Sequence, residues 1–481
     1  MKQAAIMSEK VTLTPEQIAA GKGLYGRNCE QVAARDPSYS FQQLLDREKV
    51  PVPEALREST ETYLGSEDLP ISRWTSRAFF EREVEKLWRK TWQMACRESS
   101  LRNPGDYFVY DIVNDSILLT RTQSGELKGY YNSCLHRGRA LKRGAGRGAE
   151  QLRCPYHGWS WNLEGEFQGA PCQWDFPHVT PEKFQLPQVQ VASWDGWVFI
   201  NMDDQAPPLA EYMGILPAHF AQWKHQPRYV AAHVEKVIDA NWKAVLEAFI
   251  ESYHAIATHP QLMGFQAIDN SQYDVWGDHV SRTITAYGVP NPSDAHRFSE
   301  QDSMNDMMKL AGSELRPEVP PGQTAREALA ALALPTASEQ AGEDFGGRAT
   351  MSELMDSTLY LLFPNFAPWA GHGTVISYRH RPNGDDVDSC LMDIYLLTRY
   401  PEGEEAPEDA PTLRLGSDEP FRNAAHVLGA GLAGVFEQDA ANLPQVQKGM
   451  KASKKGAVTL ANYQEVRIRH FHQTLDKYLN A

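Results

Sequence analysis

Cysteine is scarce in this chain, because its 481 residues contain only six. So few cysteines in a chain of this size do not make a disulfide framework. Long apolar runs are missing too: no stretch of about 18 apolar residues occurs, so we expect no membrane span. The first residues, MKQAAIMSEK, lack the apolar stretch of a secretory signal. We therefore expect a cytoplasmic location.

Positive charge is also in short supply. The 47 basic and 62 acidic residues give a net charge of −15. A protein that binds nucleic acid needs a broad basic surface, so we expect no nucleic-acid partner. No G-x-G-x-x-G follows a strand pattern, so direct NAD(P)H binding is not expected. The C-x-x-C-H haem motif is absent as well, since Cys29 is followed by E-Q-V.

The hydrophobic pattern divides the chain into four regions. The first two are a polar N-terminal arm, residues 1–70, and a helical segment expected to pack on the C-terminal region, residues 71–100. The other two are a region of short strands, residues 101–205, and the large C-terminal region itself, residues 206–481. In the second region, helical spacing extends over residues 75–96. In the third, alternating patterns predict strands at YFVYDIV, SILLTRT and GWVFINM.

The C-terminal region mixes helices and strands. Near-helical spacing predicts one long helix over residues 241–258 and two closing helices over 421–453 and 462–479. A sheet is predicted from LYLLFPNFAPWA, GTVISYRHR and DSCLMDIYLLTRY, the last two joined by a P-N-G-D turn. Residues 291–350 are rich in Ala, Glu, Pro and Ser, and we expect an excursion of short helices or a lid there.

Two short clips of cysteine and histidine lie in the strand-rich region. Cys134-x-His136 is followed, after 17 residues, by Cys154-x-x-His157 in the segment NSCLHRGRALKRGAGRGAEQLRCPYHGWSW. Zinc sites of this composition usually pair Cys with Cys and His with His. A Rieske [2Fe–2S] centre uses two Cys and two His, and each clip here offers one Cys and one His. The spacing favours a Rieske cluster, with zinc as the alternative.

The motif CxH…CPYHGW resembles that of the Rieske non-haem iron oxygenases, or ring-hydroxylating oxygenases, in their large α subunit. The resemblance covers about residues 70–480. It implies that Cys134 and Cys154 bind one iron and that His136 and His157 bind the other. It also implies an α+β fold, in which an N-terminal Rieske β-sandwich domain precedes a catalytic domain. In that domain an antiparallel sheet is surrounded by helices, in a helix-grip or START-like arrangement.

A second candidate metal site lies in NWKAVLEAFIESYHAIATHP. Glu247, Glu251 and His254 are spaced i, i+4, i+7 and share one face of the predicted helix. His259 falls off that face, so a bulge or a helix end must turn it inward, which the following proline permits. Two neutral imidazoles and one carboxylate are the ligand set of non-haem Fe(II) with open positions. We therefore predict His254 and His259 as iron ligands.

The family resemblance places the carboxylate ligand on a late helix. The segment VFEQDAANLPQVQKGM offers Asp439, with Glu437 as the fallback. The resemblance further implies that Asn241 lies near the iron, although Asn is also a favoured helix cap. We carry Asp439 forward as the third ligand and Asn241 as a candidate catalytic residue.

Glu251 is the other candidate catalytic residue. The resemblance implies that this acid links the two centres across a subunit boundary, by accepting a hydrogen bond from His157 of a neighbouring chain and orienting His254. Aromatic-ring dioxygenases usually have Asp there, whereas Glu occurs in relatives that act on quaternary amines. A Glu can serve the same orienting role.

The resemblance implies a terminal oxygenase that uses both iron centres to activate O₂ and to hydroxylate an aromatic or polycyclic small molecule. We expect the reaction to be a dihydroxylation. A separate NAD(P)H reductase supplies electrons, and the participation of a ferredoxin or a small β subunit stays open. Transfer between neighbours implies a ring, either a homotrimer or an α₃β₃ assembly. The alternatives are a monooxygenase that demethylates O- or N-methyl groups or acts on a quaternary amine, a protein that only transfers electrons, and a zinc-stabilised binding protein.

Two further sets of residues are candidates for binding surfaces. The apolar candidates for a substrate pocket, which are equally compatible with ordinary core, are Leu262, Phe265, Phe363, Phe366 and Trp369. The loop between the two clips is rich in basic residues, namely Arg137, Arg139, Lys142, Arg143, Arg147 and Arg153. This loop either docks an acidic electron donor or balances the charge of the cluster.

Overall fold

The computed structural model describes residues 39–481. Cys29 and most of the predicted arm lie outside the described residues. The described part of the arm forms two short helices, α2 (Phe41–Leu45) and α3 (Glu54–Arg57). Phe41 and Leu44 pack into the same buried cluster as Tyr360 of the C-terminal region, so this part of the arm is anchored on it.

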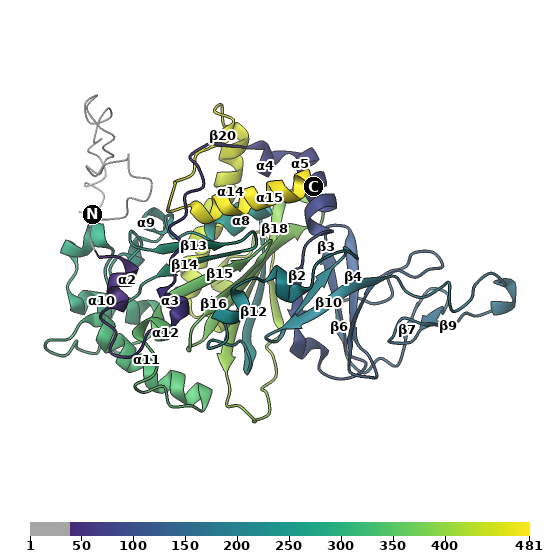
Figure 1. The fold of residues 1–481 in the computed structure, drawn as a ribbon, viewed down its shortest axis with the longest axis horizontal. Helices are drawn as coiled ribbons and strands as arrows, with labels where there is room; N and C mark the ends of the chain where they lie inside the picture. The colour runs from purple at the N-terminus through teal and green to yellow at the C-terminus, as the bar shows by residue number, and fades with distance from the viewer. Residues whose placement is uncertain (1–38) are drawn as a thin grey trace.

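An eight-stranded sheet forms the centre of the C-terminal region (Figure 1). Its strands pair antiparallel throughout, except that the last two are parallel. In spatial order they are β13 (Gln272–Trp276), β14 (Val280–Thr285), β15 (Ser357–Leu362), β16 (Phe366–Ala370), β17 (Val375–Asn383), β18 (Asp386–Arg399), β12 (Arg228–Ile238) and β19 (Thr412–Leu415). The predicted turn joins β17 to β18, and Gly384 adopts a φ of 59° there, which favours glycine.

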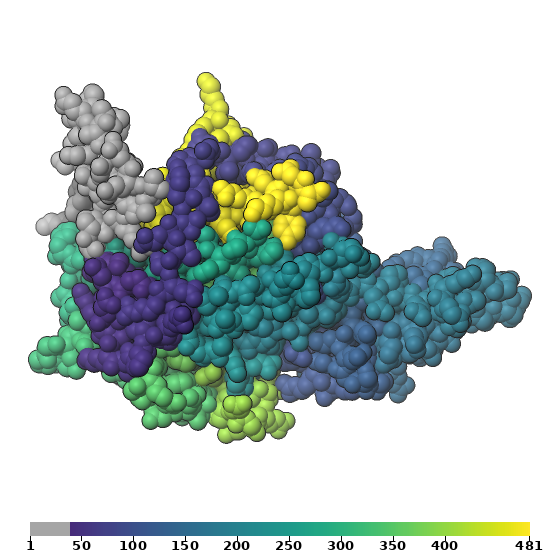
Figure 2. Space-filling view, in the orientation of Figure 1, coloured from purple at the N-terminus to yellow at the C-terminus, as the bar shows by residue number. Residues whose placement is uncertain are grey.

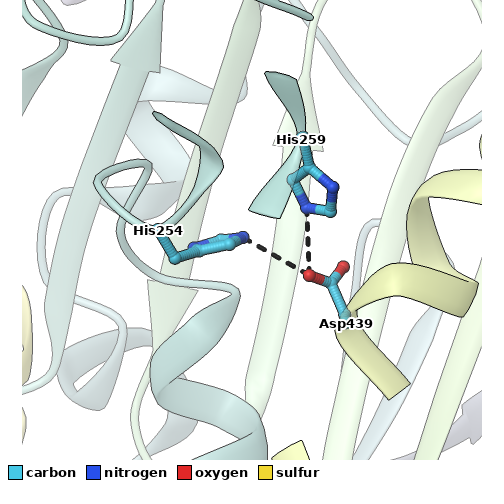
Figure 3. A group of neighbouring side chains, drawn as sticks. All are labelled: His254, His259 and Asp439. Carbon is cyan, nitrogen blue, oxygen red and sulfur yellow. Dashed lines mark ion pairs between the residues drawn. The ribbon is translucent and has the colours of Figure 1, made fainter. Parts of the chain in front are cut away.

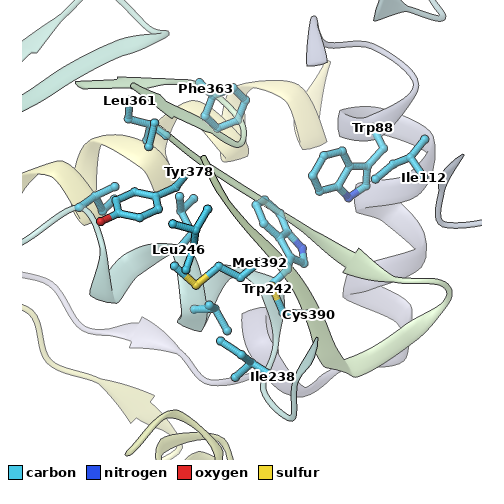
Figure 4. Packing of buried hydrophobic residues seen from close by; sticks show 14 of the residues in the cluster. Trp88, Ile112, Ile238, Trp242, Leu246, Leu361, Phe363, Tyr378, Cys390 and Met392 are labelled. Carbon is cyan, nitrogen blue, oxygen red and sulfur yellow. The ribbon is translucent and has the colours of Figure 1, made fainter. Parts of the chain in front are cut away.

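Three helices cover one face of this sheet: α8 (Trp242–Ala248), α14 (Ala430–Ala452) and α15 (Val466–Asn480). Trp242 and Leu246 of α8 pack toward Met392 and Cys390 of β18 in the main hydrophobic core (Figure 4). The other face packs in a second cluster that includes α6 (Leu209–Tyr212) and α7 (Leu216–His219). The sheet is therefore buried on both faces, and α8 is fixed against it.

The prediction of one long helix over residues 241–258 is wrong, because this segment forms two shorter helices. Helix α8 ends at Ala248, and α9 (Ala255–Thr258) follows after a break. In the break, the backbone N–H of Ser252 donates to Tyr273 Oη at 3.1 Å, and that of His254 donates to Glu251 Oε2 at 3.0 Å. Side-chain oxygens thus accept hydrogen bonds from two backbone N–H groups, which in a continuous helix would donate to backbone carbonyls of the helix.

A second, seven-stranded sheet lies N-terminal to the first. In spatial order its strands are β2 (Gln93–Arg97), β11 (Trp197–Asn201), β10 (Gln188–Trp194), β5 (Leu127–Tyr131), β4 (Asp115–Arg121), β3 (Tyr107–Ile112) and β6 (Ala145–Gly146). The helix predicted over residues 75–96 therefore extends too far. The helical segment ends with a π-helical turn, η2 (Val84–Trp88). Strand β2 follows in the sheet, and all five of its residues are buried.

A small three-stranded sheet completes the N-terminal part: β7 (Leu152–Arg153), β8 (Ser160–Trp161) and β9 (Phe167–Gly169). β7 and β9 lie toward one end of the longest axis (Figure 1), and the space-filling view shows this region as a lobe that projects from the body (Figure 2). The predicted α+β class, with a β-domain before a catalytic domain of antiparallel sheet and helices, is confirmed.

The excursion over residues 291–350 is helical. It contains η6 (Pro292–Arg297), α10 (Glu300–Leu310) and α11 (Ala325–Ala341). Both α-helices begin with a capping box, at Ser299 and Thr324, which satisfies N–H groups at each helix start. Helix α10 contacts α14, so the excursion packs against a helix of the catalytic region. Within residues 39–481, no helix is both long enough and apolar enough to cross a bilayer.

Candidate metal centres

The two Cys/His clips have matching backbone geometry. The carbonyl of Cys134 accepts from the N–H of Gly138 at 2.9 Å, and that of Cys154 accepts from Gly158 at 3.0 Å. Each cysteine also donates its own N–H to the carbonyl five residues later. The glycines have φ of 74° and 77°, where a side chain is strained. The sequence thus builds two equivalent turns, each presenting one Cys and one His.

The side chains of the clips face one another. His136 Nδ1 and His157 Nδ1 lie 3.1 Å apart, and both cysteines are buried. Burial and the neighbouring Cys154 thiol raise the pKa of Cys134. Two nitrogen ligands of one tetrahedral ion, each bonded at about 2.1 Å, lie roughly 3.4 Å apart. The donor set and this spacing therefore fit two imidazoles on one iron and two thiolates on the other.

The clips have buried aromatic residues on one side and solvent-exposed aromatic residues on the other. Trp159 is buried and stacks on His136, with ring centroids 5.0 Å apart and an interplanar angle of 6°. Tyr156, whose ring lies against His157, is 55% exposed, and Trp174 is 81% exposed. His136 and His157 are half-buried, so another protein can approach this open side of the clips.

The second candidate site gathers residues from distant parts of the chain. His259 Nε2 lies 3.0 Å and His254 Nε2 lies 3.5 Å from Asp439 Oδ1 (Figure 3). His254 precedes α9, His259 ends it with a non-helical backbone, and Asp439 comes from α14. Ligand atoms of all three lie within 4.8 Å of one another. This group, the His/His/Asp triad, therefore has the spacing to hold one metal ion.

Hydrogen bonds at the other ring nitrogen orient both histidines of the triad. His254 Nδ1 donates to Glu251 Oε1 at 2.6 Å, and His259 Nδ1 donates to Gln438 Oε1 at 2.8 Å. Each bond places a proton on Nδ1, so Nε2 is the ring nitrogen at which a metal would take the place of a proton. The ring orientations therefore match those of metal-binding histidines.

The charge of the site also suits a cation. The side chains of Glu251 and Asp439 are 7% and 6% exposed, and within residues 39–481 their ion pairs run only to His254 and His259. Burial opposes the charged form of His254, but the two carboxylates outweigh it and raise the pKa of His254 to about 10. Burial likewise opposes the charge of Asp439, yet the two histidines hold its pKa below the usual value. Buried charges are paired or coordinate metals, and these two carboxylates suit a cation as a shared partner.

A cavity with about 810 Å³ of space between atoms, part of it open to solvent, adjoins the triad. Its aromatic lining consists of Phe249, Tyr287, Trp369, Tyr378 and Phe436. Leu262 and Trp369 line it as predicted. Phe265, Phe363 and Phe366 do not line it and pack in hydrophobic clusters, in agreement with the alternative that they are ordinary core.

Asn241 and Glu247 take structural positions. Asn241 caps α8 by accepting the N–H of Lys243 at 3.1 Å, and it does not line the cavity. Its capping alternative accounts for this contact. Glu247 accepts from Trp74 Nε1 and pairs with His472 Nε2, both at 2.9 Å, instead of sharing a face with His254. The break after α8 separates these residues from the triad.

The fallback ligand, Glu437, lies outside the triad. Its side chain is 38% exposed and lies 4.0 Å from Arg422. Sequence reasoning overlooked Gln438, which orients His259. Its position immediately before Asp439 is the only signal in the sequence, and a neighbour on a helix points in a different direction from the ligand.

Family comparisons agree with this arrangement. The family described as "Ring hydroxylating alpha subunit (catalytic domain)" matches residues 218–481, and the Rieske [2Fe–2S] domain family matches residues 91–186. The chain belongs to the ring-hydroxylating oxygenase α subunits, as its motifs predict. Membership implies a Rieske cluster and a mononuclear non-haem iron, and the two sites described above fit both groups.

Individual relatives differ in their chemistry. The chain is 31% identical to the carnitine monooxygenase oxygenase subunit of Escherichia coli (strain K12) over 236 residues, 48% of this chain and 62% of that protein. It is 24% identical to the biphenyl 2,3-dioxygenase α subunit of Rhodococcus jostii (strain RHA1) over 406 residues, 79% of this chain and 78% of that protein. The match to the first relative thus spans less than two thirds of its length.

Solved structures support the same fold. A quaternary ammonium Rieske monooxygenase superposes with a TM-score of 0.61 at 17% identity, covering 85% of this chain and 95% of that chain. Naphthalene 1,2-dioxygenase with indole bound superposes with a TM-score of 0.59 at 18% identity, covering 87% and 93%. Monooxygenase and dioxygenase structures are equally similar, so they do not separate the two reactions.

Proposed function

We propose that this chain is the oxygenase component of a Rieske oxygenase system that hydroxylates a small organic molecule with O₂. The observation that carries the proposal is the His/His/Asp triad, with both Nε2 atoms turned toward Asp439 and an aromatic cavity beside it. A protein that only transfers electrons has no use for this second site. Zinc sites with two Cys and two His usually pair Cys with Cys and His with His, whereas each clip here mixes the two types.

Each proposed ligand has a stated role. Cys134 and Cys154 hold one iron of the cluster, and His136 and His157 hold the other. His254, His259 and Asp439 bind the mononuclear iron. When bound, this iron supplies O₂ activation with electrons that arrive from the cluster.

The chain's other residues position and protect the reacting groups. Glu251 orients His254. The aromatic lining holds the substrate beside the triad and excludes water from it. Because the lining is largely apolar, its main contribution is the position of the substrate rather than a proton donor.

Electron transfer is proposed to cross between chains. Strand β7, which leads directly into the second clip, lies at one end of the molecule with β9 of the same sheet, and α9 lies on the other side of the body (Figure 1). The exposed side chains of Tyr156 and Trp174 suit burial against another subunit. Both features support a ring, proposed as a homotrimer or α₃β₃, in which Glu251 receives His157 of the neighbour.

Co-assembly of two inactive variants tests this transfer. We expect Cys154→Ser chains and Asp439→Ala chains to be inactive alone and to regain activity when assembled together, since each supplies the centre that the other lacks. Mixed assemblies that stay inactive, although both chain types are present in them, would contradict transfer between chains.

The proposed substrate is an aromatic or polycyclic molecule, and the proposed reaction is dihydroxylation. The five aromatic side chains of the lining present flat apolar surfaces to such a ring. A second candidate is monooxygenation of a quaternary amine or demethylation of an N- or O-methyl group. Two observations favour it: aromatic rings beside two buried carboxylates attract a cation, and the carnitine monooxygenase subunit is among the relatives.

Electrons are proposed to come from a separate NAD(P)H reductase, directly or through a ferredoxin. The basic loop supports docking of an acidic donor, since Arg137, Arg143, Arg147 and Arg153 are exposed. Substrate-dependent O₂ uptake with a surrogate reductase tests the whole proposal, with naphthalene, biphenyl and L-carnitine as first probes. Uptake that stays at the background rate with a broad aromatic and amine panel, in protein loaded with both iron centres, would contradict it.

A further inference from the structure

Gln438 and Gln261 bond to one another through both ends of their amides. Gln438 Oε1 accepts from Gln261 Nε2 at 2.7 Å, and Gln438 Nε2 donates back to Gln261 Oε1 at 3.3 Å. A flip of Gln438 alone would bring donor to donor and acceptor to acceptor in this pair. The Gln438 oxygen faces His259 Nδ1 at 2.8 Å, which is the orientation that keeps His259 Nε2 available for a metal beside Asp439.

We infer that Gln438, clamped by Gln261, is the positioning residue that sets the tautomer and ring orientation in which His259 binds the mononuclear iron. An oxygen acceptor at Nδ1 places the ring proton there, and the Nε2 lone pair then faces the position shared with Asp439. The inference rests on the proposed function, because it requires iron at the triad.

The two histidines of the triad are positioned by groups of different charge. His254 donates to the carboxylate of Glu251 over 2.6 Å, whereas His259 donates to a neutral amide over 2.8 Å. A carboxylate makes the imidazole a stronger metal ligand than an amide does, because hydrogen bonds to a charged acceptor are stronger. The site therefore combines one strongly and one weakly supported imidazole, and a charge at position 438 would remove this difference.

Gln438 does not touch the space assigned to the substrate. Gln438 and Gln261 line a separate outer cavity, which also includes Asp306 and Lys309, and neither glutamine lines the cavity beside the triad. Substitution of Gln438 therefore changes how the metal is held while leaving substrate contacts in place. This separates a positioning role from a substrate-binding role.

Fe(II) affinity tests the inference without any substrate. We expect Gln438→Met, which keeps the length of the side chain but loses the acceptor, to weaken Fe(II) binding at the triad by about 10- to 100-fold in an anaerobic competition titration. Gln438→Glu keeps the acceptor and should bind Fe(II) at least as tightly as the wild type. Gln261→Met, which releases the clamp but leaves Gln438, should lie between the wild type and Gln438→Met.

Asn442→Leu is the matched control. Asn442 lies one turn further along α14 and contacts Thr258 Oγ1 at 3.2 Å without touching His259. Its Fe(II) affinity should equal that of the wild type. An unchanged affinity in both Gln438→Met and Gln261→Met, with the cluster signal intact, would overturn the clamp. If instead the wild type and His259→Ala take up equal amounts of Fe(II), the triad itself is not an iron site and the proposed function fails.

Discussion

The two candidate metal centres are built in opposite ways. The Cys/His clips lie within 24 residues, and local backbone bonds shape each clip in the projecting lobe that carries β7. The His/His/Asp triad joins residues almost 200 positions apart, on a broken helix and a long helix packed over a buried sheet. A site that must meet other proteins is exposed and local, whereas a site that must exclude water depends on the whole catalytic fold.

This difference predicts that each centre can be removed without the other. The clips make their stabilising contacts within their own hydrophobic cluster, which contains both cysteines and Trp161. The triad depends on the core around α8 and α14, which is a separate cluster. Variants at the two centres should therefore give complementary losses.

The largest effect is expected from Cys154→Ser. Loss of one thiolate ligand should abolish the cluster, with its visible absorption and its EPR signal after reduction, and reduce iron from about three to about one per chain. Iron analysis and EPR measure this. Cys172→Ser, which changes an exposed cysteine of the same lobe, should leave both unchanged. A cluster that persists in Cys154→Ser would show that the clips are assigned wrongly.

Asp439→Ala should produce the opposite loss. It removes the only carboxylate of the triad, so we expect about one iron fewer per chain, no substrate-dependent O₂ uptake and an unchanged cluster signal. The control is Glu437→Gln, on the same helix but outside the triad, which should retain its iron. If Glu437→Gln loses iron and Asp439→Ala does not, then Glu437 rather than Asp439 is the carboxylate ligand.

Glu247 and Glu251 lie one helical turn apart in sequence, yet only Glu251 bonds to a histidine of the triad. Burial raises the pKa of Glu247 to about 8, with smaller opposing effects from Trp74 and Lys243. Its unfolded pKa is about 4.3. The folded state keeps this proton where the unfolded state loses it, so the stability that Glu247 contributes is present below about pH 4.3 and falls as pH rises to about 8.

Glu247→Gln stays neutral at every pH. The variant should therefore lose less stability than the wild type between pH 5 and pH 8, by on the order of a few kcal/mol. Apparent melting temperatures of the catalytic region at both pH values measure the difference. Glu404→Gln, on an exposed loop, should follow the wild type. Parallel pH profiles for Glu247→Gln and the wild type would rule out a buried, protonated Glu247.

The smallest effect is expected at the basic loop. Arg143→Glu/Arg147→Glu should slow cluster reduction by an acidic donor by roughly tenfold at low salt, and the difference should shrink as salt rises. Stopped-flow reduction at two ionic strengths measures it. Lys224→Glu, an exposed charge reversal outside the loop, should leave the rate unchanged. A rate that does not depend on salt would favour the alternative, in which the loop only balances the charge of the cluster.

The two centres also differ in how far sequence alone could predict them. The clips are short and contiguous, and the structure brings together all four of their predicted ligands, because the turns need only local bonds and two glycines. The triad residues were also named, but the helix that carries them was not predicted correctly. Its break depends on the hydroxyl of Tyr273, which reaches Ser252 only after β13 has joined the sheet.

Long-range contacts explain the remaining misses. Phe366 lies on the opposite face of its strand from Trp369, which lines the cavity, whereas Phe363 follows the end of β15, and composition shows neither arrangement. The clamp on His259 depends on α14 placing Gln438 against Gln261, 177 residues away. Such pairs have no local pattern, so only the folded chain shows them.

Metal and sulfide analysis of the purified wild type, beside the His254→Ala/His259→Ala variant, tests most directly whether one chain holds both centres. We expect about three irons and two acid-labile sulfides per chain in the wild type. The double variant should keep both sulfides and about two irons, with an unchanged cluster EPR signal. A wild type without acid-labile sulfide, or a double variant with as much iron as the wild type, would contradict the account.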